Sequence, residues 1–365
     1  MIIYIALFLF LVTIFIFEIA SDNYLNAQPY VADIFYKDLG LRRKIIFRRV
    51  ESIMLWVVIC LIGFFRSEYM GKDANTYFIY YFNQVDYYTW KELLFNFKID
   101  NGFFIIVKIV SLFSKSYWIQ RGILFIISFS LYYYVFIRES PYLALSLIVF
   151  LGCTYLGLLF SILRQSLAGG IIFLGARDLK RKHIIRFLVL IAIASTIHKS
   201  ALLLLITVPY YFLNKKINTP LIIIISFIFY FIFKAVFPIV ASWYGAGRYI
   251  EDMTSGEGYY MMLFLIIIII FTSFVYNNNV PYNRELNVLY NIATFSIIIQ
   301  VGALQWALFT RLCAYVTINM GLLVPKLIKE IKTKDKLLFC LAYIVAYGFM
   351  FFLTIKGSPY SFHTL

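Results

Sequence analysis

The run MMLFLIIIIIFTSF at residues 261–274 contains no charged side chain. With its apolar neighbours it approaches the roughly 20 residues that an α-helix needs to cross the hydrocarbon core of a bilayer. Similar runs recur at 1–17 (MIIYIALFLFLVTIFIF) and 221–233 (LIIIISFIFYFIF). A membrane β-barrel would show alternating apolar and polar residues instead of solid runs. The sequence therefore predicts an all-α polytopic membrane protein.

The composition supports this class. Of the 365 residues, 62% are hydrophobic and 14% are charged, which is too little polar surface for a soluble domain. The net charge of +15 is typical of cytoplasmic loops that face anionic lipid, so we expect no nucleic-acid partner. The four cysteines lie in apolar segments and are expected to be packed thiols. Because CxxC and His-rich motifs are absent, no metal site is expected.

Clusters of basic residues predict the orientation in the membrane. They lie at 37–49, 177–186, 215–216 and 326–336. The positive-inside rule places all four in the cytoplasm. This arrangement requires roughly twelve transmembrane helices, within a range of 10 to 13, with both termini outside. No internal repeat or linker is visible, so residues 1–365 are expected to form a single integral membrane domain.

The expected helices are near 1–19, 51–65, 121–137, 142–160, 164–179, 184–197, 200–213, 219–238, 259–276, 288–305, 311–328 and 337–355. Residues 66–120 are expected to stay outside, with a helix near 102–114 lying on the membrane, dipping into it or spanning it. A second outer loop is expected at 241–258. The pair 184–197 and 200–213 is either one long kinked helix or two short helices that meet at the outer face.

Several cationic residues fall at the outer ends of helices or in outer loops. They are Arg66, Arg164, His198, Lys199, Arg248 and Arg311. A charge near the bilayer centre costs roughly 2.5–3.5 kcal/mol on insertion scales, so it usually faces a cavity or a partner. The alternative is that each side chain snorkels to the interface. Several arginines on one face favour an anionic ligand, because guanidinium binds phosphate through paired hydrogen bonds. A lipid-attached diphosphate would suit a cavity that opens sideways into the bilayer.

Local spacing supports a polar face. Ser195, His198 and Lys199 are spaced i, i+3 and i+4, which predicts a polar stripe on an apolar helix. The alternative for His198 is a hydrogen-bonded interior histidine. Gln300 and Arg311 are eleven residues apart, so they align if one helix continues between them.

The outer segment 66–90 (RSEYMGKDANTYFIYYFNQVDYYTW) combines carboxylates with many tyrosines. Aromatic faces stack on sugar rings, and carboxylates such as Asp73 bind hydroxyl groups or act as bases. The alternative is an interfacial aromatic belt. The loop at 244–260 (YGAGRYIEDMTSGEGYY) repeats the pattern, and its glycines predict a mobile lid.

Five motifs carry a family resemblance. RSEYMGKDANTYFIYYF (66–82) resembles the Arg…Gly-x-Asp…Tyr…Phe pattern of EpsG/Wzy-type polysaccharide polymerases. LRQSLAGGIIFLGARDLKRK (163–182) is similar to that family's Arg-Gln-x-x-Ala helix, and IASTIHKSALLLL (193–205) to its His-x-Ser-Ala segment. ALFTRLCAYV (307–316) and GSPYSF (357–362) resemble its Arg-Leu…Tyr and Pro-Tyr-x-Phe patterns. Lys199 departs from the family, where a less polar residue is expected.

The resemblance implies a GT-C-like glycosyltransferase in the bacterial inner (plasma) membrane. Such enzymes transfer a glycan from undecaprenyl diphosphate to another lipid-linked repeat unit at the periplasmic face. The product is O-antigen, capsule or exopolysaccharide. Donor and acceptor are thus both undecaprenyl-diphosphate-linked oligosaccharides. Neither a cofactor nor a metal is implied, and a chain-length regulator and a flippase are candidate partners.

We expect the diphosphate to be bound by Arg164 and Arg311, together with Arg66 and Arg248. His198 is the first candidate for the general base and Asp73 the second, because an imidazole or a carboxylate can accept the proton of the acceptor hydroxyl. Other substrate contacts are expected from Gln165, Tyr77, Lys199 and Tyr249. The alternatives are a flippase for lipid-linked oligosaccharides, an O-antigen ligase and a membrane-bound acyltransferase. Charge gathered at one face, beside a long outer segment, favours an enzyme over a flippase.

Overall fold

The computed structural model describes residues 1–26, 34–67, 70–71, 73–95, 101–175, 183–213, 215–243, 258–306, 308–356 and 360–363. In these residues the regular structure is helical, apart from one isolated β-bridge between Arg66 and Phe362. Contacts between the helices divide the chain into two compact units. Unit 1 comprises Met1–Leu202 and Phe351–Leu365, and unit 2 comprises Leu203–Met350.

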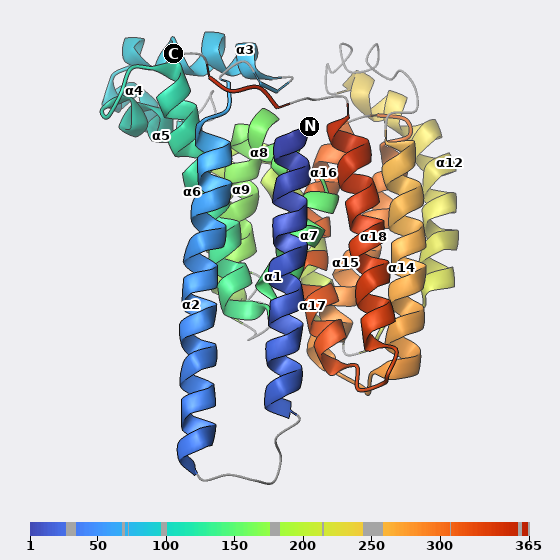
Figure 1. The fold of residues 1–365 in the computed structure, drawn as a ribbon. Coiled ribbons are helices and arrows are strands. Elements are labelled where there is room, and N and C mark those ends of the chain that lie inside the picture. Colours follow the sequence, from blue (N-terminus) through green and yellow to red (C-terminus); the bar gives the residue numbers. More distant parts are fainter. Residues whose placement is uncertain are drawn as a thin grey trace. The chain divides into compact units, whose positions relative to one another are not determined.

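Unit 1 contains long helices and a group of short ones. The helices are α1 (Ile2–Asn26), α2 (Ile34–Phe64), α3 (Ala74–Tyr77), the π-helix η1 (Phe78–Phe82), the 3-10 helix η2 (Val85–Tyr87), α4 (Trp90–Phe95), α5 (Asn101–Ser111), α6 (Tyr117–Glu139), α7 (Leu143–Gly152), α8 (Tyr155–Ser161), α9 (Leu163–Leu174) and α11 (Ile184–Ile197). The short elements from α3 to α5 lie together at one end of the unit (Figure 1). They fill the segment 66–120, which the sequence predicts to be outside the membrane.

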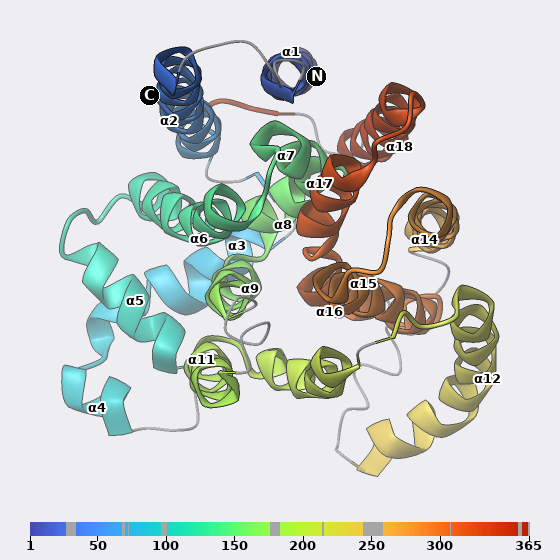
Figure 2. The ribbon, with the colours of Figure 1, turned by 90° about the horizontal axis from the view of Figure 1, so that it is seen from below.

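Helix α9 is central to unit 1, where it lies between α6 and α11 (Figure 2). Small residues allow this close packing. A Cβ atom on Gly170 would lie 2.9 Å from Cβ of Leu131 on α6. The Tyr132 hydroxyl of α6 also donates to the Ser166 carbonyl of α9 at 2.9 Å. The start of α9 is therefore held in place by the helices that flank it.

One predicted helix of unit 1 is broken. The apolar run 142–160 reads as a single helix, but α7 and α8 are separate and meet at a bend of 64°. The break follows from Thr154, whose φ of 67° lies in the left-handed region. A β-branched residue seldom adopts this conformation, and it interrupts the helical hydrogen-bond ladder. The bend directs α8 toward the start of α9.

Unit 2 is built around one largely buried helix, α15 (Arg284–Gly302). Its helices are the 3-10 helix η3 (Lys199–Phe212), which begins in unit 1, then α12 (Thr219–Trp243), α14 (Tyr259–Asn279), α15 (Arg284–Gly302), α16 (Leu308–Thr317), α17 (Met320–Glu330) and α18 (Lys336–Ile355), which ends in unit 1. Helix α15 contacts α12, α14, α16 and α17. The predicted helix 311–328 is confirmed as one candidate span over Phe309–Glu330, with a short turn between α16 and α17 at Asn319, whose side chain donates to the Val316 carbonyl at 3.0 Å. This local bond competes with helical pairing.

Within the described residues, six helices are long and apolar enough to cross a membrane, or seven if α7 and α8 form one broken span. The chain is therefore a multi-pass membrane protein. The predicted count of about twelve is not confirmed, because several predicted spans are short. Helices α5, α9, α11 and η3 are apolar but have only 10–17 residues in their apolar part. All four cysteines are buried and free, which confirms that they are packed thiols.

Candidate functional site

Arg164 lies in the first turn of α9, which confirms its predicted place at the start of a helix. Its guanidinium carbon is 4.9 Å from the centroid of the Tyr81 ring and 5.9 Å from that of Tyr77. Its backbone N–H points to the Tyr77 hydroxyl, with a donor–acceptor distance of 3.4 Å. Two tyrosines of the segment 66–90 thus frame the guanidinium. The N-terminus of a helix also carries the positive end of the helix dipole, which favours an anion.

Tyr77 is the last residue of α3, and Tyr81 belongs to the short π-helix η1 that follows it. In η1 the Asn83 N–H donates to the Phe78 carbonyl at 2.9 Å, a wider turn that is frequent at functional sites. The rings of Tyr77 and Tyr81 lie 5.7 Å apart, and Phe103 of α5 packs against both. Burial raises the pKa of Tyr77, and the nearby Arg164 lowers it only in part. The phenol is therefore neutral and can hydrogen-bond at neutral pH.

Arg66 is buried just after the end of α2, with 2% of its surface exposed. Its Nη1 donates to the Gly63 carbonyl, while Nε and Nη2 have no hydrogen-bond partner among the described residues. The rings of Phe125 and Phe160 flank the guanidinium at 5.3 and 4.8 Å. Burial first, and then the like charge of Arg121, lower the pKa of Arg66. A bound anion would offset both effects.

The C-terminal segment 360–363 covers Arg66. The Ser67 N–H donates to the Ser361 carbonyl at 2.8 Å, and the His363 N–H donates to the Phe65 carbonyl at 3.1 Å. The His363 ring stacks on Trp118 with centroids 4.2 Å apart. The C-terminal motif at 357–362 is therefore paired, through Phe362, with Arg66 of the first motif, although almost 300 residues separate the two.

Arg121 is a buried cation that the sequence analysis missed. Its Nη2 donates to the carbonyls of Met70, at 3.0 Å, and Phe160, at 2.5 Å. The sequence places Arg121 at the first position of a helix, where a charge needs no explanation. Helix α6 in fact begins at Tyr117, so Arg121 lies in its second turn and is 1% exposed. A charge inside an extended apolar helix was the signal that could have revealed it.

Gly71 lies where the outer segment crosses the end of α8. Its φ is +114°, and a Cβ atom there would lie 2.8 Å from the Phe160 carbonyl oxygen and 2.9 Å from Ser161 Oγ. Only glycine combines this backbone conformation with such a close approach. Two residues later, Asp73 precedes α3 and is half-buried. The segment that carries Arg66 and Asp73 is thus fastened to the junction that leads into α9.

His198 ends α11 and does not continue it. Its φ of −151° and ψ of 113° are extended, and Lys199 begins η3. The predicted helical stripe over 195–199 is therefore wrong. Helices α9 and α11 pack side by side, and α5 lies close to both the end of α11, through Gly102 and Thr196, and Tyr77 beside Arg164, so the start of α9 and the end of α11 lie at the same end of the unit. Gly102 of α5 also lies against Thr196, beside Phe103.

The remaining predicted site residues differ in exposure. Gln165 is buried in α9, His198 is half-buried and Lys199 is exposed. Arg248 and Tyr249 lie outside the described residues. Within those residues, no group of three or more His, Cys, Asp and Glu could hold a metal ion.

Arg311 belongs to unit 2, where it lies on α16. Its predicted alignment with Gln300 along one helix is wrong, because α15 ends at Gly302. Gln300 instead donates through Nε2 to the Gly258 carbonyl, at 3.1 Å, and lies 3.4 Å from the hydroxyl of Thr310. Gly258 ends the loop that is predicted to be a lid. That end of the loop is therefore fixed beside the residue that precedes Arg311.

Taken together, these features define a polytopic helical membrane protein with an arginine framed by two tyrosines at the start of α9 and a buried arginine after α2. The profile of the EpsG family matches residues 50–363, and the chain belongs to this family. It is therefore a polysaccharide-biosynthesis membrane protein of the glycosyltransferase-like polymerase type. No curated protein and no solved structure matches the chain.

Proposed function

We propose that the protein polymerises lipid-linked glycans at the outer face of the bacterial inner membrane. The donor is a glycan on undecaprenyl diphosphate, and the acceptor is a second lipid-linked repeat unit. The bond between the sugar and the diphosphate breaks, and a bond to an acceptor hydroxyl oxygen forms. The hydroxyl proton passes to a base, and undecaprenyl diphosphate leaves. Membership of the EpsG family supports the class of reaction.

The observation that carries the proposal is the arrangement around Arg164. A guanidinium at a helix N-terminus, framed by Tyr77 and Tyr81, suits a diphosphate next to a sugar. Arg164 would neutralise the charge that develops on the leaving group, with Arg311 and Arg248 as further candidates. Buried Arg66, whose Nε and Nη2 have no hydrogen-bond partner among the described residues, is a further candidate for the same role.

For the base, His198 and Asp73 remain the two candidates. Both belong to unit 1, and the packing of α5, α9 and α11 puts His198 at the same end as Arg164. Diphosphate is a good leaving group, so no general acid is required. Holding two lipid-linked reactants together supplies much of the remaining acceleration. An O-antigen ligase would use the same donor chemistry with a different acceptor. A flippase is disfavoured by the long outer segment packed against Arg164.

Replacing Arg164 tests the proposal. Lysine keeps the charge but cannot make the paired contact with phosphate, so Arg164→Lys should lose most polymerisation and Arg164→Ala at least as much. Losing one charge-assisted hydrogen bond of about 1.5–3 kcal/mol predicts a roughly 10- to 200-fold lower rate. The measurement is the chain-length distribution made by purified protein from lipid-linked repeat units.

Arg186→Lys is the matched control. Arg186 is an exposed arginine at the other end of α11, and its replacement should leave the distribution unchanged. If Arg164→Lys makes full-length polymer at normal protein levels, Arg164 only snorkels to the interface and is not part of the site.

A further inference from the structure

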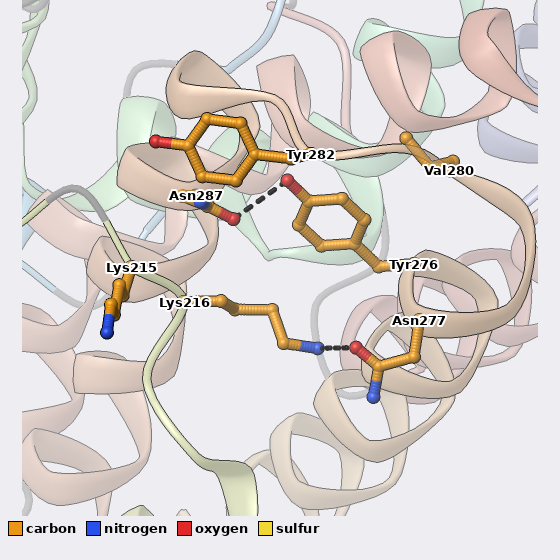
Figure 3. Close-up of a pocket in the computed structure, with 7 residues that line it drawn as sticks. All are labelled: Lys215, Lys216, Tyr276, Asn277, Val280, Tyr282 and Asn287. Carbon is orange, nitrogen blue, oxygen red and sulfur yellow. Dashed lines mark hydrogen bonds between the residues drawn. The ribbon is translucent and has the colours of Figure 1, made fainter.

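Unit 2 contains a second cationic site, separate from the residues discussed above. A pocket of about 250 Å³ lies where the loop before α12 meets α14 and α15 (Figure 3). It is lined by Lys215, Lys216, Tyr276, Asn277, Val280, Tyr282 and Asn287. None of these seven residues carries a carboxylate, so the only formal charges in the described lining are two ammonium groups.

Lys216 is half-buried without a negative partner in the described part of the chain. Its ammonium donates to Ser273 Oγ at 3.1 Å, and it also donates to Asn277 Oδ1 (Figure 3). Both acceptors are neutral. It lies 5.2 Å from the centroid of the Tyr276 ring and 4.8 Å from that of Tyr290. Burial lowers the pKa of Lys216. An anion beside it would favour the charged form.

Lys215 is exposed, and its ammonium forms no hydrogen bond or ion pair with another described residue. Figure 3 shows that Lys216 reaches toward Asn277, whereas Lys215 points away from it. Lys215 is therefore available to a ligand, and Lys216 is held in place by its hydrogen bonds.

The backbone of this loop is fixed by α15. Asn291 accepts from the Ile217 N–H at 2.8 Å and donates to the Lys215 carbonyl at 2.9 Å. Thr219 bonds the Tyr290 hydroxyl and also donates to Ser273 at 3.0 Å. Both lysines are thus presented from a preorganised turn, which reduces the entropic cost of binding.

The pocket lies at a membrane surface. Tyr276 and Asn277 are in the last turn of α14, a candidate span over Tyr259–Asn279, and Lys215 and Lys216 directly precede a candidate span over Thr219–Val236. Spans of this length cover the hydrocarbon core, so their ends meet the lipid headgroups. Basic residues at such an end attract anionic lipid.

We propose that this pocket binds the phosphate of an anionic lipid headgroup, with Lys215 and Lys216 as its cationic ligands. The phosphate would accept from the Lys215 ammonium and from the remaining proton of Lys216. The glycerol part would lie against the tyrosine rings. The site is independent of the proposed polymerase chemistry, because none of its residues belongs to that proposal.

Native mass spectrometry of the full-length protein in detergent tests this proposal. Phosphatidylglycerol is titrated against the wild type, Lys215→Gln and Lys216→Gln, with phosphatidylcholine as the zwitterionic lipid. Lys332→Gln is the matched control, because Lys332 is an exposed lysine in another loop of the same unit. Losing one charge-assisted hydrogen bond should weaken the tightest phosphatidylglycerol site about 10-fold or more in both pocket variants. The control should bind like the wild type.

Three results would contradict the proposed lipid site. Equal phosphatidylglycerol binding by the wild type and Lys215→Gln overturns the proposal, and this variant changes an exposed side chain that should not affect folding. Equal binding of phosphatidylcholine and phosphatidylglycerol also overturns it. If inorganic phosphate displaces the lipid at equal concentration, the pocket binds phosphate from solution, and the lipid as its source is refuted.

Discussion

At the scale of single residues, the orientation of Arg164 depends on the rings around it. A guanidinium is attracted to the face of an aromatic ring by the ring quadrupole. The closer ring, that of Tyr81, comes from the π-helix η1 and is held by Phe103 and Phe104 of α5. The hydroxyl group of Tyr81 is not needed for this contact, so ring and hydroxyl can be tested separately.

The effect of a substitution at Tyr81 should therefore depend on whether the new side chain keeps an aromatic ring. Tyr81→Phe keeps the ring and should polymerise close to the wild-type rate. Tyr81→Leu removes a contact of about 0.5–2 kcal/mol, which corresponds to a roughly 2- to 30-fold loss. The measurement is the initial rate of polymerisation at saturating and limiting donor. Equal rates for the two variants would show that the ring does not orient Arg164.

The sequence predicted some of these residues and not others. Arg164 and Tyr77, which two separate motifs predicted as substrate-binding residues, lie next to each other. Arg121 was missed because it lies near a helix boundary, and boundaries are uncertain by several residues when read from sequence. The pairing of Arg66 with segment 360–363 could not be predicted, because a contact between distant ends of a chain leaves no local pattern.

At the scale of elements, a few contacts hold the segment 66–90 in its position. Arg121 joins the Met70 carbonyl to the Phe160 carbonyl, and Gly71 lies against the same turn. These contacts set where α3 and η1 lie relative to α9. The geometry around Arg164 is therefore a consequence of packing that begins at α6 and α8.

Arg121→Leu should loosen this segment without unfolding the bundle. The change leaves two buried carbonyls without their charged donor, which costs about 1.5–3 kcal/mol. Hydrogen exchange of residues 73–82 should become faster, while exchange in α14 and α15 stays the same. Arg138→Leu, which removes an exposed arginine from the other end of α6, is the control and should change neither region. Unchanged exchange in Arg121→Leu would show that Arg121 does not fasten the segment.

Most helices could be predicted from apolar periodicity, and α11 was predicted with its observed bounds. The break between α7 and α8 could not be predicted. Thr154 adopts a left-handed conformation that its residue type disfavours, so tertiary packing and not local propensity decides the bend between α7 and α8. By contrast, the end of α11 before His198 was predicted, although no proline or glycine marks it.

At the scale of the whole molecule, the central expectation is the orientation in the membrane. The basic clusters predict that the segment around Asp73 is outside and the loop around Lys334 is inside. The four native cysteines are free thiols, so they are replaced to give a background in which only the introduced cysteine can react. Tyr87 is 81% exposed, which makes it a suitable outer position.

Single cysteines at positions 87 and 334 test this orientation in intact spheroplasts. A membrane-impermeant thiol reagent should label Tyr87→Cys and should label Lys334→Cys only after the cells are opened. Solubilised protein, in which both positions react, is the control. Labelling of position 334 but not of position 87 in intact cells would reverse the orientation and move Arg164 to the cytoplasmic side.

The most direct test of the proposed function is the surface glycan of a strain from which the gene has been deleted. Loss of a polymerase should leave single repeat units in place of a ladder of chain lengths, and the intact gene should restore the ladder while an Arg164→Ala copy should not. The measurement is electrophoresis of the surface polysaccharide together with analysis of the lipid-linked intermediates. An unchanged ladder, or lipid-linked repeats trapped on the cytoplasmic side as expected for a lost flippase, would contradict the proposal.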